Sequence, residues 1–448
     1  MSPPVTTRLP TGSRAAPSLT RRSLLTGAAG LATAGALSSC ATSAASGTLP
    51  LAYWHLLSGP DGVTMGSLVE EFNAEHEDVE VTQTVLAWGS PYYTKLAMAS
   101  AGGRAPDVAI MHAARVPGYA PGGLVDTWDA DLLAELGVTQ EDFPDLIWEK
   151  NVFEGELTAI ALDSHPFVLY YNTEIAEAAG ALDSDGQLVE VSEPEEFREL
   201  ARELGAVSGD GHGLAFGYLN DGSNMWRMFY TYYTQTGATV ELPVGGTMQY
   251  DEATAIDTLE WILSLIDGEI GNASHDGGTA ISEFVTGGAG MFFGGVWETG
   301  NYRAAGLPFD MKVIPAVFGQ PSAYADSHSF ILPHQDNPDE ERRRWAHQFV
   351  AETLQGSLVW ADAGHIPAYT PVVESAEYGN LVPQSHYADA TDVLVYDPPA
   401  WFSGSGGDFH KYFGEYIQNV FMRTEDPLVG WNGFVERINS LLSKPSPV

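Results

Sequence analysis

The chain has 448 residues and a formal net charge of −39, because 59 aspartates and glutamates outnumber 20 lysines and arginines. A surface of this sign repels nucleic acid and anionic lipid headgroups, so composition argues against a nucleic-acid-binding protein and against membrane binding through the folded surface. The length exceeds what one hydrophobic core usually serves, which predicts two lobes.

The N-terminal segment has the features of an export signal. Arg21 and Arg22 precede an apolar run that is too short to span a bilayer and ends in Leu-Ser-Ser-Cys at Cys40. A paired arginine is typical of twin-arginine (Tat) export, although Sec export stays open, and the last four residues resemble the lipobox of bacterial lipoproteins. We therefore expect a signal peptide at 1–39, lipidation of Cys40, a Ser/Ala/Gly-rich flexible tether at 40–48, and a lipid-anchored protein on the extracellular face of the cell membrane.

The next segments alternate between strand and helix patterns. Short apolar or alternating runs predict strands at Leu49–His55, Val79–Leu86 and Pro106–Met111. Helical spacing separates them, and Ser90 is expected to cap the second helix. This β-α-β-α-β order predicts an α/β fold with an open, mostly parallel sheet, in which ligands bind beyond the carboxyl ends of the strands.

The later chain repeats this theme without a repeated sequence. Residues 192–195 read as a capping box before a helix. Further strands are expected at Ala159–Tyr171, Gly290–Phe293 and Met311–Pro315, and further helices at Asp251–Ile266, Pro338–Leu354, Asp408–Phe421 and Val429–Leu442.

Several short stretches, taken in order, resemble one family. They are Tyr53-Trp54-His55 with Gly59-Pro60-Asp61-Gly62, Leu68-Val69-Glu70-Glu71-Phe72-Asn73, Ala105-Pro106-Asp107-Val108, Leu169-Tyr170-Tyr171-Asn172, Gly287-Gly288-Ala289-Gly290-Met291 with Gly295-Val296-Trp297, Ser327-His328-Ser329-Phe330, and Ala363-Gly364-His365-Ile366-Pro367. The chain resembles family 1 extracellular solute-binding proteins, the maltose-binding-protein-like receptors of carbohydrate ABC transporters.

The resemblance implies a periplasmic-binding-protein-like fold (type II) with two discontinuous lobes, joined by a hinge around a ligand cleft. We expect lobe 1 to comprise 49–164 and 327–374, and lobe 2 to comprise 165–326 and 375–448 with the C-terminal helices. The implied function is capture of a mono- or oligosaccharide by a monomer, without catalysis, cofactor or metal. Its implied partners are the transmembrane subunits of an ABC permease, with no nucleic acid and no membrane contact beyond the lipid.

Aromatic side chains are candidates for stacking on the apolar face of a sugar ring. Trp297 follows a Gly-Gly turn at a predicted strand end, and Trp88 and Tyr92 flank the Ser90 cap. Trp226 resembles a family position that stacks on ligand, and Trp401 lies in a loop where the family supplies another aromatic.

Carboxylates and imidazoles are candidates for binding sugar hydroxyls. Asp61 lies in the turn that opens the first helix, His112 follows a strand, and Glu298 follows Trp297. Asp163 and His165 lie where the resemblance places the first crossing between lobes, and His55 ends the first strand. For each acid or imidazole, a purely structural role stays open.

Two other classes of function stay open at this point. A binding protein for a polyamine, glycerol phosphate or peptide would share the fold, although only Lys95 and Arg115 lie near the expected ligand loops to meet a phosphate. A secreted glycoside hydrolase needs a carboxylate pair that no motif singles out. The twelve histidines show no metal-ligand spacing, and the single cysteine excludes an internal disulfide and a thiolate cluster.

Overall fold

The computed structural model describes residues 48–446. The expected signal peptide at 1–39, Cys40 and the tether up to residue 47 lie outside these residues. Leu49–Val448 forms one unit by its internal contacts, and everything below concerns this unit.

The strands in chain order are β1 Leu49–His55, β2 Val79–Val85, β3 Val108–His112, β4 Val125–Asp126, β5 Val152–Phe153, β6 Glu156–Leu157, β7 Ala159–Ala161, β8 Asp163–Asn172, β9 His212–Ala215, β10 Ala289–Gly295, β11 Phe309–Lys312, β12 Ala323–Asp326, β13 His328–Pro333, β14 Ile366–Pro367 and β15 Leu394–Val395. The helices are α1 Gly59–Glu75, α2 Ser90–Ala101, α3 Ala130–Glu135, α4 Asp145–Glu149, α5 Thr173–Ala179, α6 Pro194–Gly205, α7 Gly222–Gln235, α8 Glu252–Leu265, α9 Gly277–Val285, α10 Thr299–Ala305, α11 Glu340–Gln355, α12 Leu358–Asp362, α13 Thr370–Val373, α14 Ala376–Gly379, α15 Asp408–Phe421 and α16 Pro427–Leu442.

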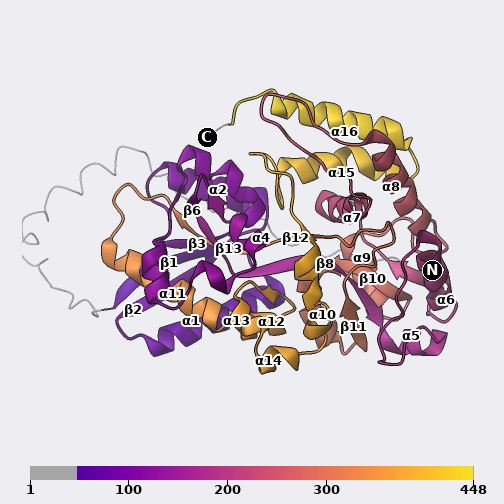
Figure 1. Cartoon of the computed structure of the whole chain (residues 1–448), viewed down its shortest axis with the longest axis horizontal. Helices are drawn as coiled ribbons and strands as arrows, with labels where there is room; N and C mark the ends of the chain where they lie inside the picture. The colour runs from indigo at the N-terminus through magenta and orange to yellow at the C-terminus, as the bar shows by residue number, and fades with distance from the viewer. Residues whose placement is uncertain (1–47, 447–448) are drawn as a thin grey trace, which may run out of the picture. The chain divides into compact units, whose positions relative to one another are not determined.

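Two sheets organise these elements into two lobes (Figure 1). The first sheet has the order β2-β1-β3-β13-β4, with β7 also pairing β13, and we call the part built around it the first lobe. The second has the order β15-β12-β8-β10-β9, with β11 and β14 also pairing β8, and it organises the second lobe. The predicted two-lobed α/β class is confirmed.

The sheets are mixed, however, where a mostly parallel arrangement was expected. The early strands β1, β2 and β3 are parallel, as their alternation with helices predicted. The strands that pass between lobes run the other way: β13 is antiparallel to β3, and β8 is antiparallel to β10, β11, β12 and β14. A chain that returns to a sheet from another lobe is not bound to the right-handed βαβ connection, so it can enter with either direction.

Each sheet is buried on both faces because alternate side chains of its strands enter different hydrophobic clusters. In β3, Val108 and Ile110 pack into one cluster, whereas Ala109 and Met111 pack into another. In β8, Phe167 and Leu169 face one cluster and Val168 faces another. This two-sided burial fits the near-continuous apolar runs in the sequence.

The chain crosses between the sheets within very few residues. β7 ends at Ala161 in the first sheet and β8 begins at Asp163 in the second. The return follows the same pattern, since β12 ends at Asp326 in the second sheet and β13 begins at His328 in the first. The exact lobe limits given above stay a prediction.

Two helix starts differ from the sequence expectation. Gly89 rather than Ser90 is the N-cap of α2, and its φ of 83° is one that glycine adopts without strain. Glu193 rather than Ser192 precedes α6, and no side-chain cap is formed there; the Ser192 amide instead donates to the Glu196 carboxylate at 3.0 Å. Among residues 48–446, no helix combines the length and apolarity needed to cross a bilayer.

Candidate functional site

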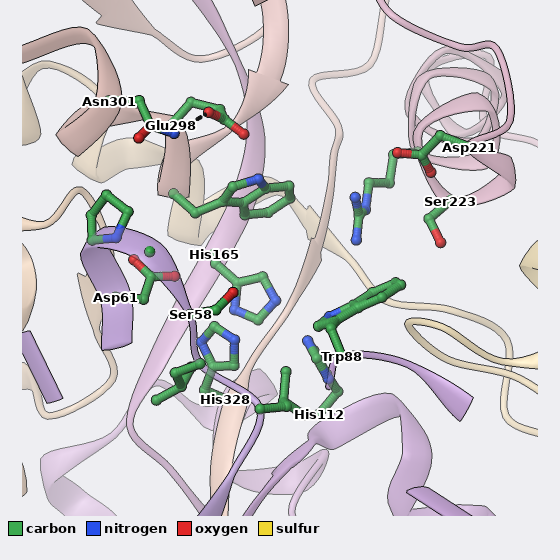
Figure 2. Close-up of a pocket in the computed structure, with 16 residues that line it drawn as sticks. Ser58, Asp61, Trp88, His112, His165, Asp221, Ser223, Glu298, Asn301 and His328 are labelled. Atoms are coloured by element: carbon green, nitrogen blue, oxygen red, sulfur yellow. Dashed lines mark hydrogen bonds between the residues drawn. The ribbon is translucent and has the colours of Figure 1, made fainter. Parts of the chain in front are cut away.

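A cavity of about 400 Å³ lies where loops and strand ends of both lobes meet (Figure 2). The first lobe contributes the segment after β1, the loop after β2, the end of β3 and the start of β13. The second lobe contributes β8, the start of α7 and the segment after β10. The lining residues are Leu56, Leu57, Ser58, Gly59, Pro60, Asp61, Trp88, His112, His165, Asp221, Ser223, Arg227, Trp297, Glu298, Asn301 and His328.

The parallel strands of the first sheet explain how distant residues converge here. β1 pairs with β3, so the carboxyl ends of both strands lie at the same edge of the sheet. Asp61 in the first turn of α1 and His112 at the end of β3 therefore reach one cavity. His328 joins them because it is paired in register with His112 across β13 and β3.

A second cavity of about 530 Å³ continues from the first past Trp88, Asp221 and Ser223, which line both. Its far wall includes Gly406 and Lys411. The two cavities together form a groove that is longer than the first cavity alone.

Asp163 is a buried carboxylate that contacts side chains from several of the segments crossing between the lobes. Its Oδ1 accepts from Nδ1 of His165 on β8 at 3.0 Å, and its Oδ2 lies 2.8 Å from Nδ1 of His328 on β13. Oδ2 also lies 3.1 Å from Nδ1 of His365, which directly precedes β14, and it accepts from the Trp360 indole at 2.6 Å. Burial alone would raise the pKa of Asp163, but the three imidazoles hold it well below its ordinary value.

Two of the histidines around Asp163, His165 and His365, differ in charge. Burial, together with the nearby His328, lowers the pKa of His165 to about 3, so its imidazole is neutral at pH 7. Burial also disfavours charge on His365, but the carboxylates of Asp61 and Asp163 outweigh it and raise its pKa to about 10. Nε2 of His365 lies 3.1 Å from Asp61 Oδ1, so a buried imidazolium joins the first turn of α1 to the start of β8.

The imidazoles that line the cavity are oriented by partners on their inner side. Nδ1 of His112 contacts the Tyr93 hydroxyl at 2.5 Å, and burial lowers the pKa of His112 well below its ordinary value. His165 and His328 are both held through Nδ1 by Asp163, and their rings stack at 4.2 Å. Figure 2 shows these three side chains along one wall of the cavity. The neutral imidazoles of His112 and His165, fixed in this way, each offer one defined donor or acceptor to a ligand hydroxyl.

The rest of the cavity lining combines an indole with charged groups. The Arg227 guanidinium lies 4.7 Å from the centre of a Trp297 ring. Glu298 accepts a hydrogen bond from Asn301 at 2.8 Å, and burial raises the pKa of its carboxyl. Trp88 reaches the cavity from the first lobe and remains 46% exposed.

Donor atoms of Asp163, His165, His328 and His365 lie within 4.8 Å of one another, close enough to hold a metal ion. The sequence expectation of no metal site rested on spacing along the chain. Asp163 and His165 are close together in it, but His328 and His365 lie far from them. The ion pairs and hydrogen bonds around Asp163 account for the cluster without an ion, so we assign it to the hinge.

Six of the residues singled out from the sequence line the first cavity. They are Asp61, Trp88, His112, His165, Trp297 and Glu298. Their contact with a ligand stays a prediction, but the structure brings them together from both lobes.

Two of the proposed stacking residues belong to the core instead. Trp226 is fully buried, stacks on Tyr230 and donates its indole N–H to Asp397 at 2.6 Å. Tyr92 is also fully buried, and its hydroxyl donates to the carbonyl oxygen of Ile110 at 2.5 Å. Neither ring has a free face, so both assignments are corrected to packing roles.

Three further candidates lie near the cavity without lining it. His55 is buried and contacts Gln83 at 3.0 Å, so it braces β1 against β2. Asp163 acts behind the cavity wall by fixing His165. Trp401 lines another hollow beside Arg115, packed against the second-lobe core.

Sequence reasoning missed Ser58, Asp221, Ser223, Arg227 and Asn301, and named His328 only within the family resemblance, not as a ligand candidate. The start of α7 carries three of these. A signal was available, because Asp221 has the side chain expected of an N-cap, and it accepts from the Asn224 amide at 2.9 Å. Each residue of a helix is rotated by about 100° from the last, so when Trp226 turns into the core its neighbour Arg227 faces the cavity.

Comparison with known proteins gives a family and a fold. Residues 58–352, more than half of the chain, match the family model of the bacterial extracellular solute-binding proteins. A search of curated protein sequences finds no match.

Solved structures with the same fold cover nearly the whole unit. The GacH receptor of Streptomyces glaucescens, solved unliganded and with acarbose, is 18% identical with a TM-score of 0.73, covering 89% of this chain and 99% of that one. The maltose/maltodextrin-binding domain MalE of Bdellovibrio bacteriovorus, bound to maltotriose, is 20% identical with a TM-score of 0.70, covering 88% and 100%. UgpB of Mycobacterium tuberculosis, in complex with glycerophosphocholine, is 18% identical with a TM-score of 0.72, covering 88% and 99%. At these identities the likeness establishes the fold, and together with the family match it shows that this chain belongs to the bacterial extracellular solute-binding proteins.

Proposed function

We propose that this protein is the receptor of a carbohydrate ABC importer, which binds a saccharide between its lobes and delivers it to the permease. The observation that carries the proposal is the cavity itself. Trp88 and Trp297 offer flat apolar faces from different lobes, and fixed imidazoles and carboxylates line the same cavity. Sugars need this combination, because one side of the ring is apolar and its edge carries hydroxyls.

The size of the groove favours more than one sugar ring. The first cavity is within the range of about 300–1,000 Å³ typical of small-molecule sites. The second cavity extends it past Trp88, so a bound oligosaccharide would run from Trp297 toward Lys411. The structural relatives crystallised with acarbose and maltotriose support this choice.

A thermal-shift screen over mono- and oligosaccharides, followed by calorimetry, tests the proposal. A ligand at 100 times its Kd stabilises the folded state by about 2.7 kcal/mol, which a melting curve resolves. We expect at least one sugar to bind with 1:1 stoichiometry, and Trp297→Ala to weaken it. If no sugar stabilises the protein while polyamines, glycerol phosphates or peptides do, the solute is of another class.

Catalysis is not expected from this site, because a receptor must release its sugar unchanged. Incubation with chromogenic glycosides should give no turnover above that of buffer. Measurable hydrolysis that is lost in Glu298→Gln would instead assign the protein to the glycoside hydrolases.

We further propose that Cys40 carries the lipid that holds the receptor at the membrane. The support is the sequence around Cys40 and the acidic composition, which gives the folded surface little affinity for anionic lipid. Labelling cells with an alkyne fatty acid should tag the wild type but not Cys40→Ser, which should be released into the medium. Changing Arg21 and Arg22 to lysine should block export through the Tat route, whereas unchanged export would indicate Sec.

A further inference from the structure

Arg227 is a buried cation in the cavity wall without an acidic partner. Its side chain is 7% exposed, yet no carboxylate of residues 48–446 lies within 4.0 Å of its guanidinium. Its recorded hydrogen bond is a long one, from Nη1 to Asn224 Oδ1 at 3.4 Å, and its Nε is buried with no partner. The other buried side chain among the lysines and arginines of residues 48–446, Lys312, pairs with Glu190 and also donates to the Leu188 carbonyl at 2.9 Å. A buried charge is ordinarily paired with an opposite charge, and the described residues supply none to Arg227.

Two aromatic rings hold the guanidinium in place without neutralising it. Arg227 lies 4.7 Å from the Trp297 ring centre and 5.8 Å from that of Tyr324. Such contacts stabilise a cation through the faces of the rings and leave the N–H groups at the guanidinium edge free. The fork of donors is thus fixed in direction, which favours two-point binding of a carboxylate or phosphate.

The acids that line the same cavity are each committed to another partner. Asp61 pairs with His365 at 3.1 Å, and Glu298 accepts from Asn301 at 2.8 Å. Asp221 caps α7 by accepting from the Asn224 amide at 2.9 Å. Asp61 and Glu298 would repel an anion at their end of the cavity, which favours a negative group near Arg227 instead.

We infer that Arg227 forms an anion subsite, and that the saccharide bound here carries a negative group, a carboxylate or a phosphate, which pairs with its guanidinium. This inference rests on the proposed function and narrows it to acidic saccharides. Trp297 would stack on the ring whose acidic substituent reaches Arg227, and the neutral imidazoles of His112 and His165 would bind its hydroxyls.

Calorimetry with matched neutral and acidic sugars tests the subsite. The pairs are galactose with galacturonate, glucose with glucuronate, and glucose with glucose 6-phosphate, so that carboxylate and phosphate are distinguished. In the wild type, we expect one acidic member to bind roughly tenfold or more tightly than its neutral partner, as suits a charge-assisted pair. Arg227→Gln should abolish this preference, and Arg227→Lys should keep part of it, because the charge remains without the planar fork.

Arg344→Gln is the matched control. Arg344 is exposed on α11 and lines neither cavity, so its loss should leave the preference intact. If Arg227→Gln keeps the preference as Arg344→Gln does, the subsite at Arg227 is refuted.

The melting temperature of the ligand-free protein provides a second readout, which a purely structural role would move differently. Removing an uncompensated buried charge stabilises the fold, whereas losing its contacts with the two rings destabilises it, so the melting temperature of Arg227→Gln should change little. A marked drop would mean that the guanidinium already has its partner within the fold, which overturns the inference.

The outcomes separate this inference from the proposed function. If neutral sugars bind as tightly as or more tightly than their acidic partners, the receptor function stands and the anion subsite is refuted. If no sugar of either kind binds, the proposed function fails and the inference falls with it.

Discussion

Trp297 and Trp226 both lie on second-lobe segments that border the cavity, but the surroundings of their side chains differ. Trp297 lines the cavity, whereas Trp226 is enclosed by Tyr230 and Phe409 and bonded to Asp397. The first therefore has a face to offer to a ligand, and the second stabilises the fold.

Replacing each tryptophan by alanine should separate these roles. Trp297→Ala should weaken sugar binding by roughly tenfold or more, since stacking and burial of the ring are lost, with little change in stability. Trp226→Ala should lower the free energy of unfolding by about 3–5 kcal/mol, the usual cost of emptying a buried aromatic site. Calorimetry and urea titration measure the two quantities, and the reverse result would exchange the assignments.

The charged imidazole of His365 stabilises the folded protein, and this stabilisation is lost at alkaline pH. Its pKa is raised from 6.5 to about 10 in the folded state, so the folded protein holds a proton that the unfolded chain releases above pH 6.5. The stabilisation by this imidazolium is complete below about pH 6.5 and is lost as the pH rises through about 10. Urea titrations across this range should show the stability gap between wild type and His365→Gln shrinking as the pH increases.

His347→Gln is the control for this prediction. His347 is also buried, but its burial lowers its pKa, so its ring is neutral in both states above pH 6.5. The gap between wild type and His347→Gln should stay flat over the same range. A gap for His365→Gln that is equally flat would show that its ring is uncharged.

At the residue scale, a local rule placed two candidates in the cavity wall. His112 and Trp297 lie at or just after strand ends, where ligands bind in α/β folds, and both line the cavity, while their contact with a ligand stays a prediction. Trp226 failed because a family resemblance locates a segment to within a residue or two, and on a helix one residue decides between core and cavity. Asp163 as a common acceptor of three imidazoles was out of reach, since it depends on segments some 200 residues apart in the sequence.

Three of the missed residues lie in α7 or directly before it, and α7 begins in tight contact with α15. A Cβ on Gly222, the first residue of α7, would lie 2.2 Å from the carbonyl oxygen of His410. Glycine at this position thus lets the two helices approach, and the approach sets where Ser223 and Arg227 lie.

Gly222→Ala should therefore force the helices apart. We expect a loss of about 1–3 kcal/mol in the free energy of unfolding, as for other overpacked sites, with weaker ligand binding because the start of α7 moves. Gly277→Ala is the matched control, since Gly277 is also the first residue of a helix, α9, and its added Cβ would meet nothing within 4 Å. Thermal melts and calorimetry on both variants check the pair, and equal effects would contradict the packing argument.

Elements were easier to predict than their pairing. The early strands and α15 follow from apolar periodicity, and α15 has the predicted limits Asp408–Phe421. The direction of β8 and β13 was not predicted, because it depends on how the chain returns between lobes rather than on any local pattern.

For the whole molecule, the arrangement of two lobes around one cavity favours motion about the crossing segments. A ligand that contacts both walls binds a closed form better than an open one and shifts the equilibrium toward it. The expectation of two lobes around a ligand cleft came from chain length and family resemblance, but the full lining of that cleft, including Ser223 and Arg227, needed the structure.

Small-angle scattering with and without a bound sugar tests this closure. We expect a smaller radius of gyration in the complex, and no decrease for Trp297→Ala at a sugar concentration that saturates only the wild type. A radius that stays constant in the saturated wild type would mean that the lobes hold one arrangement throughout.

The partial exposure of Trp88 has a practical consequence. An indole that is 46% open to water at the mouth of the cavity emits at longer wavelength than a shielded one, and an arriving sugar would cover it. Ligand binding should therefore shift the tryptophan fluorescence emission of the protein to shorter wavelength. This shift should be absent in Trp88→Phe, and it would allow binding to be followed in real time without an added label.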